Sequence, residues 1–321
     1  MSRETLSVRV ARKTKEALDI CGFELVDAAG GPLPSFSAGS HVDVHLPNGL
    51  TRQYSLCNDP AETHRYQLGV LRDPSSRGGS LTMHELVREG DVLQISAPKN
   101  HFALAHDAKH HLLLAGGIGV TPILCMAERL AITGAAFEMH YCTRSRERTA
   151  FHDRIAGSAF ADQVHFHFDD GPASQAIDLD ALLAAPADGR HLYVCGPKGF
   201  MDAVLGRARA NGWPEGQIHF EFFTAAPVDH DTDAAFRVKL ASSGRVIDVE
   251  REQTVVQALA ANGVVVQTSC EQGVCGTCLT RVIEGEPDHR DQYLTPEEQA
   301  ANDQFTPCCS RAKSPMLVLD L

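Results

Sequence analysis

Four cysteines near the end of the chain are spaced as iron ligands would be: Cys270, Cys275, Cys278 and Cys308. Four residues separate the first two, two residues separate the second and third, and 29 residues separate the third and fourth. This C-x4-C-x2-C…C arrangement is that of a plant-type [2Fe–2S] cluster, which needs four converging thiolates. Gly273 and Gly276 suit a loop that wraps closely around such a cluster, because glycine adopts positive φ at little cost.

Two alternatives stay open for these cysteines. Zinc also binds thiolates, although zinc knuckles usually pair C-x2-C units and the sequence has no second unit with a matching gap. Cys309 directly follows Cys308 and is the rival fourth ligand. We prefer Cys308 because it gives the 29-residue spacing. We therefore predict an electron-transfer cluster, which must receive its electrons from elsewhere in the chain.

Two short segments in the first hundred residues suit an anionic ligand. In "RQYSL", residues 52–56, Arg52 offers a planar fork for phosphate, and Tyr54 and Ser55 can pack on and hydrogen-bond a ring. In "SRGGSLTMHE", the run from Arg77 through Gly78 and Gly79 to Ser80 precedes a short helical stretch and can cradle an anion. Either segment alone is equally typical of a surface turn. Together they predict binding of a flavin phosphate.

Two further segments join a buried strand to a helix. "LLLAGGIGVTP" places Gly116, Gly117 and Gly119 at such a junction, with Thr121-Pro122 where a dinucleotide fingerprint would have its third glycine. "YVCGPKGFMDAV" places Cys195, Gly196 and Pro197 at a second junction. Because parallel strands end at one edge of their sheet, we expect the two turns to form a ligand crevice.

The elements that must position these residues fall into three domains. Residues 1–103 alternate apolar and polar positions between Gly- and Pro-rich turns, which predicts an antiparallel β-barrel. Residues 104–224 alternate strands and helices, which predicts an α/β domain with a parallel sheet. Residues 225–234 are acidic and aperiodic, as in a linker. Residues 235–321 predict a small α+β module, so the fold class is multi-domain.

Composition excludes several kinds of partner. A net charge of −12 over 321 residues argues against nucleic acid, which needs basic clusters. No stretch approaches the roughly 18 apolar residues of a membrane helix. The start "MSRETLSVRV" shows no apolar segment typical of a signal peptide, so we expect a cytoplasmic protein without a membrane partner.

Six motifs in order give the chain a family resemblance: "RQYSLCND", "SRGGS", "AGGIGVTP", "CGPKGFMD", "HFEFF" and "SCEQGVCGTC…CCSRA". The chain resembles the ferredoxin-reductase superfamily, specifically the three-domain reductases similar to phthalate dioxygenase reductase and vanillate O-demethylase reductase. The resemblance covers essentially the whole chain and implies a β-grasp ferredoxin domain at its end. It also implies FMN, NADH as electron donor and a terminal Rieske-type oxygenase as acceptor. We expect a monomer, since an internal ferredoxin module removes any need for a second carrier.

The resemblance also implies roles for single residues. The FMN site would comprise Arg52, Gln53, Tyr54, Ser55, Val70, Arg77, Gly78, Gly79 and Ser80. Ser55 and Thr121 would lie near the isoalloxazine, with Phe223 stacked on the ring where the nicotinamide must enter. The NADH site would comprise Gly116, Gly117, Gly119, Thr143, Arg144, Cys195, Gly196 and Pro197. Arg144 and Arg146 in "CTRSRE" could instead accept a 2′-phosphate, so NADPH stays open as the donor.

Two other functions stay open beside the oxygenase reductase. The chain could be a free-standing flavin or ferric reductase, or a redox carrier or sensor without fast turnover. Among the 16 histidines, the "HFH" at 165–167 could form a metal pair. Alternating histidines on a strand more often mark a half-solvated face, and we expect this of His165 and His167. We expect the same of His41, His45, His110 and His111.

Overall fold

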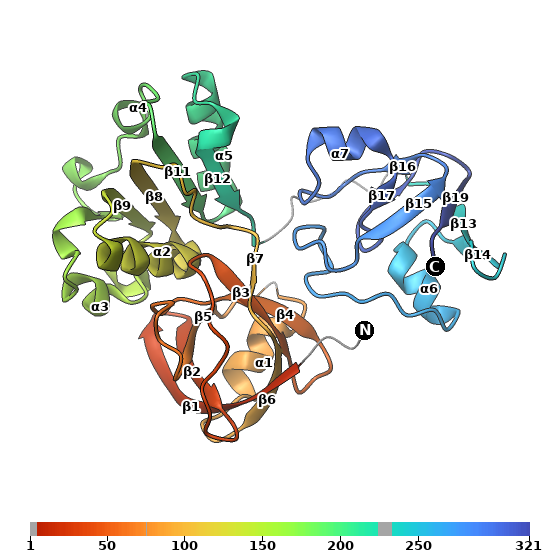
Figure 1. Cartoon of the computed structure of the whole chain (residues 1–321), viewed down its shortest axis with the longest axis horizontal. Helices are drawn as coiled ribbons and strands as arrows, with labels where there is room; N and C mark the ends of the chain where they lie inside the picture. The colour runs from red at the N-terminus through yellow and green to blue at the C-terminus, as the bar shows by residue number, and fades with distance from the viewer. Residues whose placement is uncertain (1–4, 75, 224–232) are drawn as a thin grey trace. The chain divides into compact units, whose positions relative to one another are not determined.

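The computed structural model of the chain describes residues 5–74, 76–223 and 233–321. The chain divides into two compact units, Met1–Phe223 and Thr224–Leu321, which Figure 1 draws in red to green and in blue. We describe each unit by itself. Within the described residues, none of the helices has both the length and the apolar character needed to cross a membrane.

The first unit begins with a seven-stranded antiparallel sheet: β1 (Thr5–Ala17), β2 (Ile20–Asp27), β3 (Ser40–His45), β4 (Thr51–Ser55), β5 (Tyr66–Leu71), β6 (Val92–Ser96) and β7 (Lys99–Asn100). The order is β4-β3-β6-β1-β2-β5, with β7 beside β3. An isolated β-bridge joins Leu56, just after β4, to Leu68 within β5. Apolar residues on alternate positions fill the interior, as the period-two pattern predicts. Helix α1 (Gly79–Glu85) packs against β5.

The rest of the first unit is a parallel sheet of five strands: β8 (His110–Gly116), β9 (Phe137–Thr143), β10 (Val164–Phe168), β11 (Arg190–Cys195) and β12 (Ile218–Glu221). The α-helices are α2 (Val120–Thr133), α3 (His152–Ala156), α4 (Leu179–Leu182) and α5 (Lys198–Ala210). The 3₁₀ turns are η1 (Gly117–Gly119), η2 (Arg146–Arg148), η3 (Ala161–Gln163), η4 (Ala173–Gln175) and η5 (Glu215–Gln217). The strand order is β10-β9-β8-β11-β12. The chain adds β9 and β10 on one side of β8 and then returns to add β11 and β12 on the other side, so the order of addition reverses between β8 and β11. This reversal makes it a doubly wound sheet.

Strand β8 shows why the sheet is covered on both faces. Leu113 and Ala115 pack into the core that contains α2, whereas Leu112 and Leu114 pack into the core that contains α5. The α2 core also takes in residues of the barrel and of the segment after it, including Ile20, Cys57 and Phe102. The α2 core therefore spans the barrel and the nucleotide domain, in addition to the core that each has of its own, which explains why they form a single unit.

The second unit is a five-stranded sheet in the order β14-β13-β19-β15-β17. Its strands are β13 (Phe236–Leu240), β14 (Val246–Val249), β15 (Thr280–Glu284), β17 (Gln304–Phe305) and β19 (Met316–Leu319). A separate pair joins β16 (Pro287–Asp288) to β18 (Arg311–Ala312). The helices are α6 (Val255–Ala261) and α7 (Pro296–Ala301), each begun by a threonine capping box. The predicted fold class is confirmed.

Most of the predicted linker, residues 225–232, lies outside the described residues. Asp233, its first described residue, is buried rather than solvated. Its carboxylate lies 2.6 Å from Arg290 and 3.6 Å from Arg311. Arg311 also donates to the carbonyl of Ala234. Asp233 and Ala234 are thus held by the second unit, a role that their acidic surroundings in the sequence do not reveal.

Candidate functional site

The two strand-to-helix turns of the parallel sheet touch each other. Strands β8 and β11 are neighbours, with Ala115 opposite Cys195. A Cβ placed on Gly119 would lie 2.3 Å from the carbonyl oxygen of Cys195 and 2.7 Å from the nitrogen of Gly196. Only glycine permits this approach of one backbone to the other. The two turns predicted from sequence therefore form one site.

The other two glycines of the first turn also have a geometric reason. A Cβ on Gly116 would lie 2.8 Å from both Pro197 and Phe200. Gly117 has a φ of +52°, the left-handed region that favours glycine. The turns lie where the strand order reverses, which is the place where open α/β sheets bind ligands. Geometry and topology both point to a nucleotide crevice here.

Thr143 and Arg144 follow at the carboxyl end of β9. Thr143 is buried, and its hydroxyl donates to the carbonyl of Ser145 at 3.1 Å and lies 2.8 Å from the hydroxyl of Thr149. Arg144 has an exposed side chain, and its carbonyl accepts from the amide of Asp170 at 3.2 Å. Thr143 therefore shapes the turn, while Arg144 faces solvent.

A cavity of about 760 Å³ lies beside this end of the sheet. Its acidic lining residues are Glu16, Glu147, Asp153 and Asp170. Its basic lining residues are Lys15, Arg146 and Arg154. Arg154 forms an ion pair with Glu128 at 2.5 Å, and Arg146 lies 3.8 Å from Asp153. The cavity thus has no excess of basic groups.

Arg52 and the glycine loop meet in the barrel. A Cβ on Gly79 would lie 2.7 Å from Cγ and 2.9 Å from Nε of Arg52, so the arginine side chain crosses directly over this glycine. Gly78 has a φ of +93° and precedes α1. Asn48 donates to its carbonyl at 3.4 Å. The structure therefore brings together the two segments that sequence analysis joined only by hypothesis.

The neighbouring predicted residues have varied surroundings. Ser80 accepts a bond from the amide of Asp73 at 3.2 Å, and the side chain of Arg77 is exposed. Gln53 donates to Asp43 at 3.0 Å, and burial raises the pKa of Tyr54. The side chain of Val70 packs in the barrel core, where the Val70 carbonyl lies 2.8 Å from Nε2 of His84. Val70 thus contributes to the barrel wall.

Ser55 lies in a group that sequence analysis did not identify. The Ser55 side chain is hydrogen-bonded to Glu221, which stands opposite Cys195 where β11 pairs with β12. Burial raises the pKa of Glu221 to about 8, although the bond to Ser55 opposes this shift. Within the described residues, Oε2 of Glu221 is buried without a hydrogen-bond partner. An acid enclosed by aromatic residues in "HFEFF" was the available signal.

Cys195, Thr121 and Phe223 complete this part of the site. Cys195 is fully buried, and burial raises the pKa of its thiol well above its usual value. The Thr121 hydroxyl donates to the Ile118 carbonyl at 3.1 Å, and its methyl group packs against Gly69 of β5. Phe223, just after β12, is 36% exposed. Thr121 therefore joins the barrel to the nucleotide domain, while the Phe223 ring keeps an open surface.

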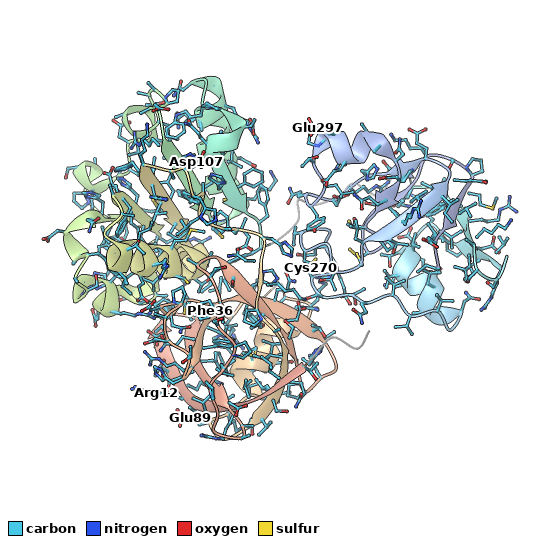
Figure 2. The ribbon with its side chains drawn as sticks, viewed as in Figure 1. Arg12, Phe36, Glu89, Asp107, Cys270 and Glu297 are labelled. Atoms are coloured by element: carbon cyan, nitrogen blue, oxygen red, sulfur yellow. The ribbon has the colours of Figure 1, made fainter. Side chains whose placement is uncertain are left out.

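The cysteine loop lies in the second unit between α6 and β15, where Figure 2 labels Cys270. All four predicted ligands are buried. The sulfur of Cys270 lies within hydrogen-bonding distance of those of Cys275 and Cys308, and that of Cys308 reaches Cys278. The thiols compete for protons, so these contacts lower the pKa of Cys270 and raise that of Cys308. Thiolates gathered out of water need a positive counter-charge, which iron supplies.

The backbone of the loop is shaped around these sulfurs. Amide groups of Gln272 and Thr277 lie 3.3 and 3.5 Å from the sulfurs of Cys270 and Cys275. Gly276 has a φ of +64°, and a Cβ there would lie 2.2 Å from the ring of Tyr293. Such a loop fits a cluster that needs close wrapping and amide donors.

The rival ligand Cys309 contacts the sulfur of Cys308 and lies beside the cysteine loop, but no contact with the sulfurs of Cys270, Cys275 or Cys278 is found for it among the described residues. Its sulfur lies 3.3 Å from the hydroxyl of Thr306 and would be 2.4 Å from a Cβ on Gly273. Cys308, by contrast, contacts two of the loop sulfurs. The geometry favours Cys308 as the fourth ligand.

Comparison with known proteins gives consistent matches. Residues 238–313 match the family described as 2Fe-2S iron-sulfur cluster binding domain, and residues 96–218 match the N-terminal domain of dimethylamine monooxygenase subunit DmmA-like proteins. Vanillate O-demethylase oxidoreductase of Pseudomonas putida is 57% identical over 97% of this chain and 98% of its own.

Solved structures agree with these sequence matches. The structure described as phthalate dioxygenase reductase, "a modular structure for electron transfer from pyridine nucleotides to [2Fe-2S]", is 40% identical, with a TM-score of 0.78 over 99% of this chain and 98% of its own. An intact type IV self-sufficient cytochrome P450 monooxygenase matches 99% of this chain through 41% of its own, at 40% identity and a TM-score of 0.85. The predicted resemblance is confirmed: the chain belongs to the family of iron–sulfur flavoprotein oxidoreductases that act as reductase components of oxygenases, among them vanillate O-demethylase oxidoreductase and phthalate dioxygenase reductase.

Proposed function

We propose that the chain carries electrons from NADH, through FMN and a [2Fe–2S] cluster, to a terminal Rieske-type oxygenase. The observation that carries this proposal is the presence in one chain of a nucleotide crevice beside the Ser55–Glu221 pair and of four buried, converging cysteines. When bound, the flavin supplies the step between a two-electron donor and a one-electron acceptor. The protein supplies binding, orientation and protection from water.

Arg52 and the loop from Arg77 to Ser80 are the proposed phosphate site of FMN. Arg52 crosses Gly79, so its guanidinium and the loop amides can face one phosphate. Tyr54 and Ser55, at the end of the same strand, would then lie along the ring system, with Gln53 and Val70 shaping the pocket. Glu221 would hold a proton on its carboxyl group at neutral pH, because burial raises its pKa to about 8.

The two touching turns are the proposed NADH site, lined by Gly116, Gly117, Gly119, Thr143, Arg144, Cys195, Gly196 and Pro197. Phe223 would cover the flavin ring where the nicotinamide enters, with Thr121 behind the ring. The cavity beside β9 supports NADH over NADPH, because the four acidic groups of its lining oppose a 2′-phosphate and outnumber its three lysine and arginine side chains.

Cys270, Cys275, Cys278 and Cys308 are the proposed cluster ligands. Their electron acceptor would be a separate protein, since the relatives named above serve oxygenases. The oxygenase component of a vanillate O-demethylase is the first partner to test, given the 57% identity over nearly the whole chain. We further propose that the protein works as a monomer in the cytoplasm, where thiols stay reduced.

An anaerobic visible spectrum, followed by titration with NADH and cofactor extraction, tests the proposal. We expect one FMN and one [2Fe–2S] cluster per chain, bleaching of both by NADH, and reduction of the added oxygenase component. A protein without iron and flavin after anaerobic reconstitution would contradict the proposal.

The same experiment separates the two other functions. Rapid turnover with free FMN or a ferric chelate, and none with the oxygenase component, would indicate a free-standing reductase. A bound flavin that NADH does not bleach would indicate a carrier or sensor.

A further inference from the structure

Three side chains of metal-ligand type gather on the edge strand of the parallel sheet and on the strand beside it. Glu138 and His140 belong to β9, and His165 belongs to β10, where it stands directly opposite His140. One carboxylate oxygen and one ring nitrogen from each histidine all lie within 4.8 Å of one another. None of these residues belongs to the two turns, the cysteine loop or the cavity lining. The cluster is therefore separate from the cofactor sites.

The individual distances match those between ligands of one metal ion. Oε1 of Glu138 lies 3.1 Å from Nε2 of His140 and 3.4 Å from Nε2 of His165. Ligands at about 2.0–2.1 Å from a tetrahedral zinc ion are about 3.3 Å apart. Within the described part of the chain, Nε2 of His140 has no hydrogen-bond partner. His140 is only 8% exposed, so water does not readily satisfy this nitrogen.

A hydrogen-bond relay defines which nitrogen of His140 is free. Nδ1 of His167 lies 2.8 Å from the carbonyl oxygen of Gln175, which only accepts, so this nitrogen must carry a proton. In a neutral His167 the other nitrogen, Nε2, is then an acceptor, and it lies 2.9 Å from Nδ1 of His140. His140 therefore donates through Nδ1. Its Nε2 is left with an unshared lone pair, as in metal-binding histidines oriented by an outer partner.

We propose that Glu138, His140 and His165 bind one divalent transition-metal ion, with Zn²⁺ as the best-suited ion and His167 as the residue that orients His140. Two imidazoles and one carboxylate are a zinc-type ligand set that leaves a fourth position for water. The ion would join the edge strand β10 to β9. It has a route from solvent, since the side chains of Glu138 and His165 are 33% and 51% exposed.

The guanidinium of Arg190 opposes binding of a metal cation here and makes the test stringent. Arg190 lies 3.8 Å from Oε2 of Glu138, the carboxylate oxygen that the cluster does not use. His110, at the start of β8, is also close enough to Glu138 and Arg190 for their charges to act on it. Without a metal, a protonated histidine would be the counter-charge of Glu138, and that arrangement is the competing explanation.

The test uses the full-length protein loaded with its flavin and cluster, so that the cysteine ligands are occupied. Zn²⁺ is titrated against a chromophoric chelator, and the bound ion is then examined by X-ray absorption at the zinc edge. We expect one tightly bound equivalent with nitrogen and oxygen neighbours and the scattering pattern of imidazole. Sulfur neighbours, or binding too weak to compete with the chelator, would overturn the proposal.

Matched variants connect the binding to these side chains. Glu138→Gln and His165→Ala should each weaken Zn²⁺ binding by at least about tenfold, and His167→Ala by about 10- to 100-fold. His106→Ala removes an exposed histidine of the same domain and should leave the affinity unchanged. Equal affinity in the wild type and His165→Ala would overturn the site. Flavin reduction by NADH should be the same in all four variants, which shows that each is folded.

Discussion

At the scale of single residues, Glu221 shows how burial decides a protonation state. Its carboxyl group lies between Ser55 and the end of β11, and burial raises its pKa from 4.5 to about 8. A carboxyl group that stays protonated at neutral pH can donate as well as accept a hydrogen bond. The Ser55–Glu221 pair can therefore hold a proton beside the proposed flavin site.

Replacing Glu221 with Gln should stabilise the first unit increasingly as the pH rises. The folded state binds the Glu221 proton more tightly than the unfolded state, so wild-type stability falls from about pH 4.5 and levels off above about pH 8. Each pKa unit corresponds to about 1.4 kcal/mol. Thermal melts of wild type and variant at pH 5, 7 and 9 measure the difference. A constant difference across this range would show that Glu221 is already ionised in the folded protein.

Replacing Phe223 with Ala should change the rate at which NADH reduces the bound flavin, because it removes the aromatic ring that we propose covers the nicotinamide entry. The ring is 36% exposed, so the change should not disturb folding. Stopped-flow single turnovers measure the rate, and flavin content serves as the control. Unchanged rates at full flavin content would exclude a role for Phe223.

At the scale of elements, the two glycine turns depend on each other. Gly119 lets the β8–α2 turn lie against the carbonyl of Cys195, and any side chain there meets backbone rather than a movable group. The nucleotide crevice is thus a property of two elements packed together, not of either motif alone.

The substitution Gly119→Ala should separate the turns and weaken NADH binding, with flavin content and cluster absorbance retained. Gly206→Ala is the matched control, because a Cβ there meets nothing within 4 Å and the residue lies inside α5. It should be neutral or stabilising by about 0.5–1 kcal/mol. Nucleotide titrations of both variants measure the effect, and normal NADH affinity in Gly119→Ala would contradict it.

Local patterns predicted the fold class but not the long-range contacts. Strand alternation is a local signal, so the antiparallel sheet, the parallel sheet and the final α+β module were accessible from sequence, whereas the joining of the first two into one compact unit was not. Glu221 and Asp233 were missed, because their burial depends on residues far along the chain. The expectation of half-solvated histidines is wrong for His41 and His111, which are each 4% exposed. Tyr193, distant in sequence, stacks on His111.

At the scale of the whole molecule, the two compact units separate the two halves of the proposed pathway. Cys275→Ser should abolish cluster absorbance and reduction of cytochrome c but spare flavin reduction by NADH. The reason is that the residues proposed to bind flavin and nucleotide all belong to Met1–Phe223. Spectra and stopped-flow rates of the variant measure both properties. Loss of flavin reduction as well would assign the loop a structural role.

The rate at which the protein reduces its oxygenase partner should depend on ionic strength. Residues 236–321 contain 12 acidic and 8 basic side chains, so a basic docking face on the oxygenase would be attracted. Rates of oxygenase reduction measured across a range of salt concentrations should fall as salt increases. A flat response would show that charge does not guide the encounter.

The common core of barrel and nucleotide domain has a consequence for recombining such proteins. Phe102 and Tyr193, from the two sides of residue 103, have ring centroids 6.2 Å apart within this core. A chimera that takes the barrel from one protein and the nucleotide domain from another, joined at residue 103, would combine side chains from two different cores. These side chains would pack poorly against each other. Among the described residues, the hydrophobic core of the second unit is a cluster of its own, so we expect a crossover after Phe223, which exchanges the ferredoxin module, to be tolerated better.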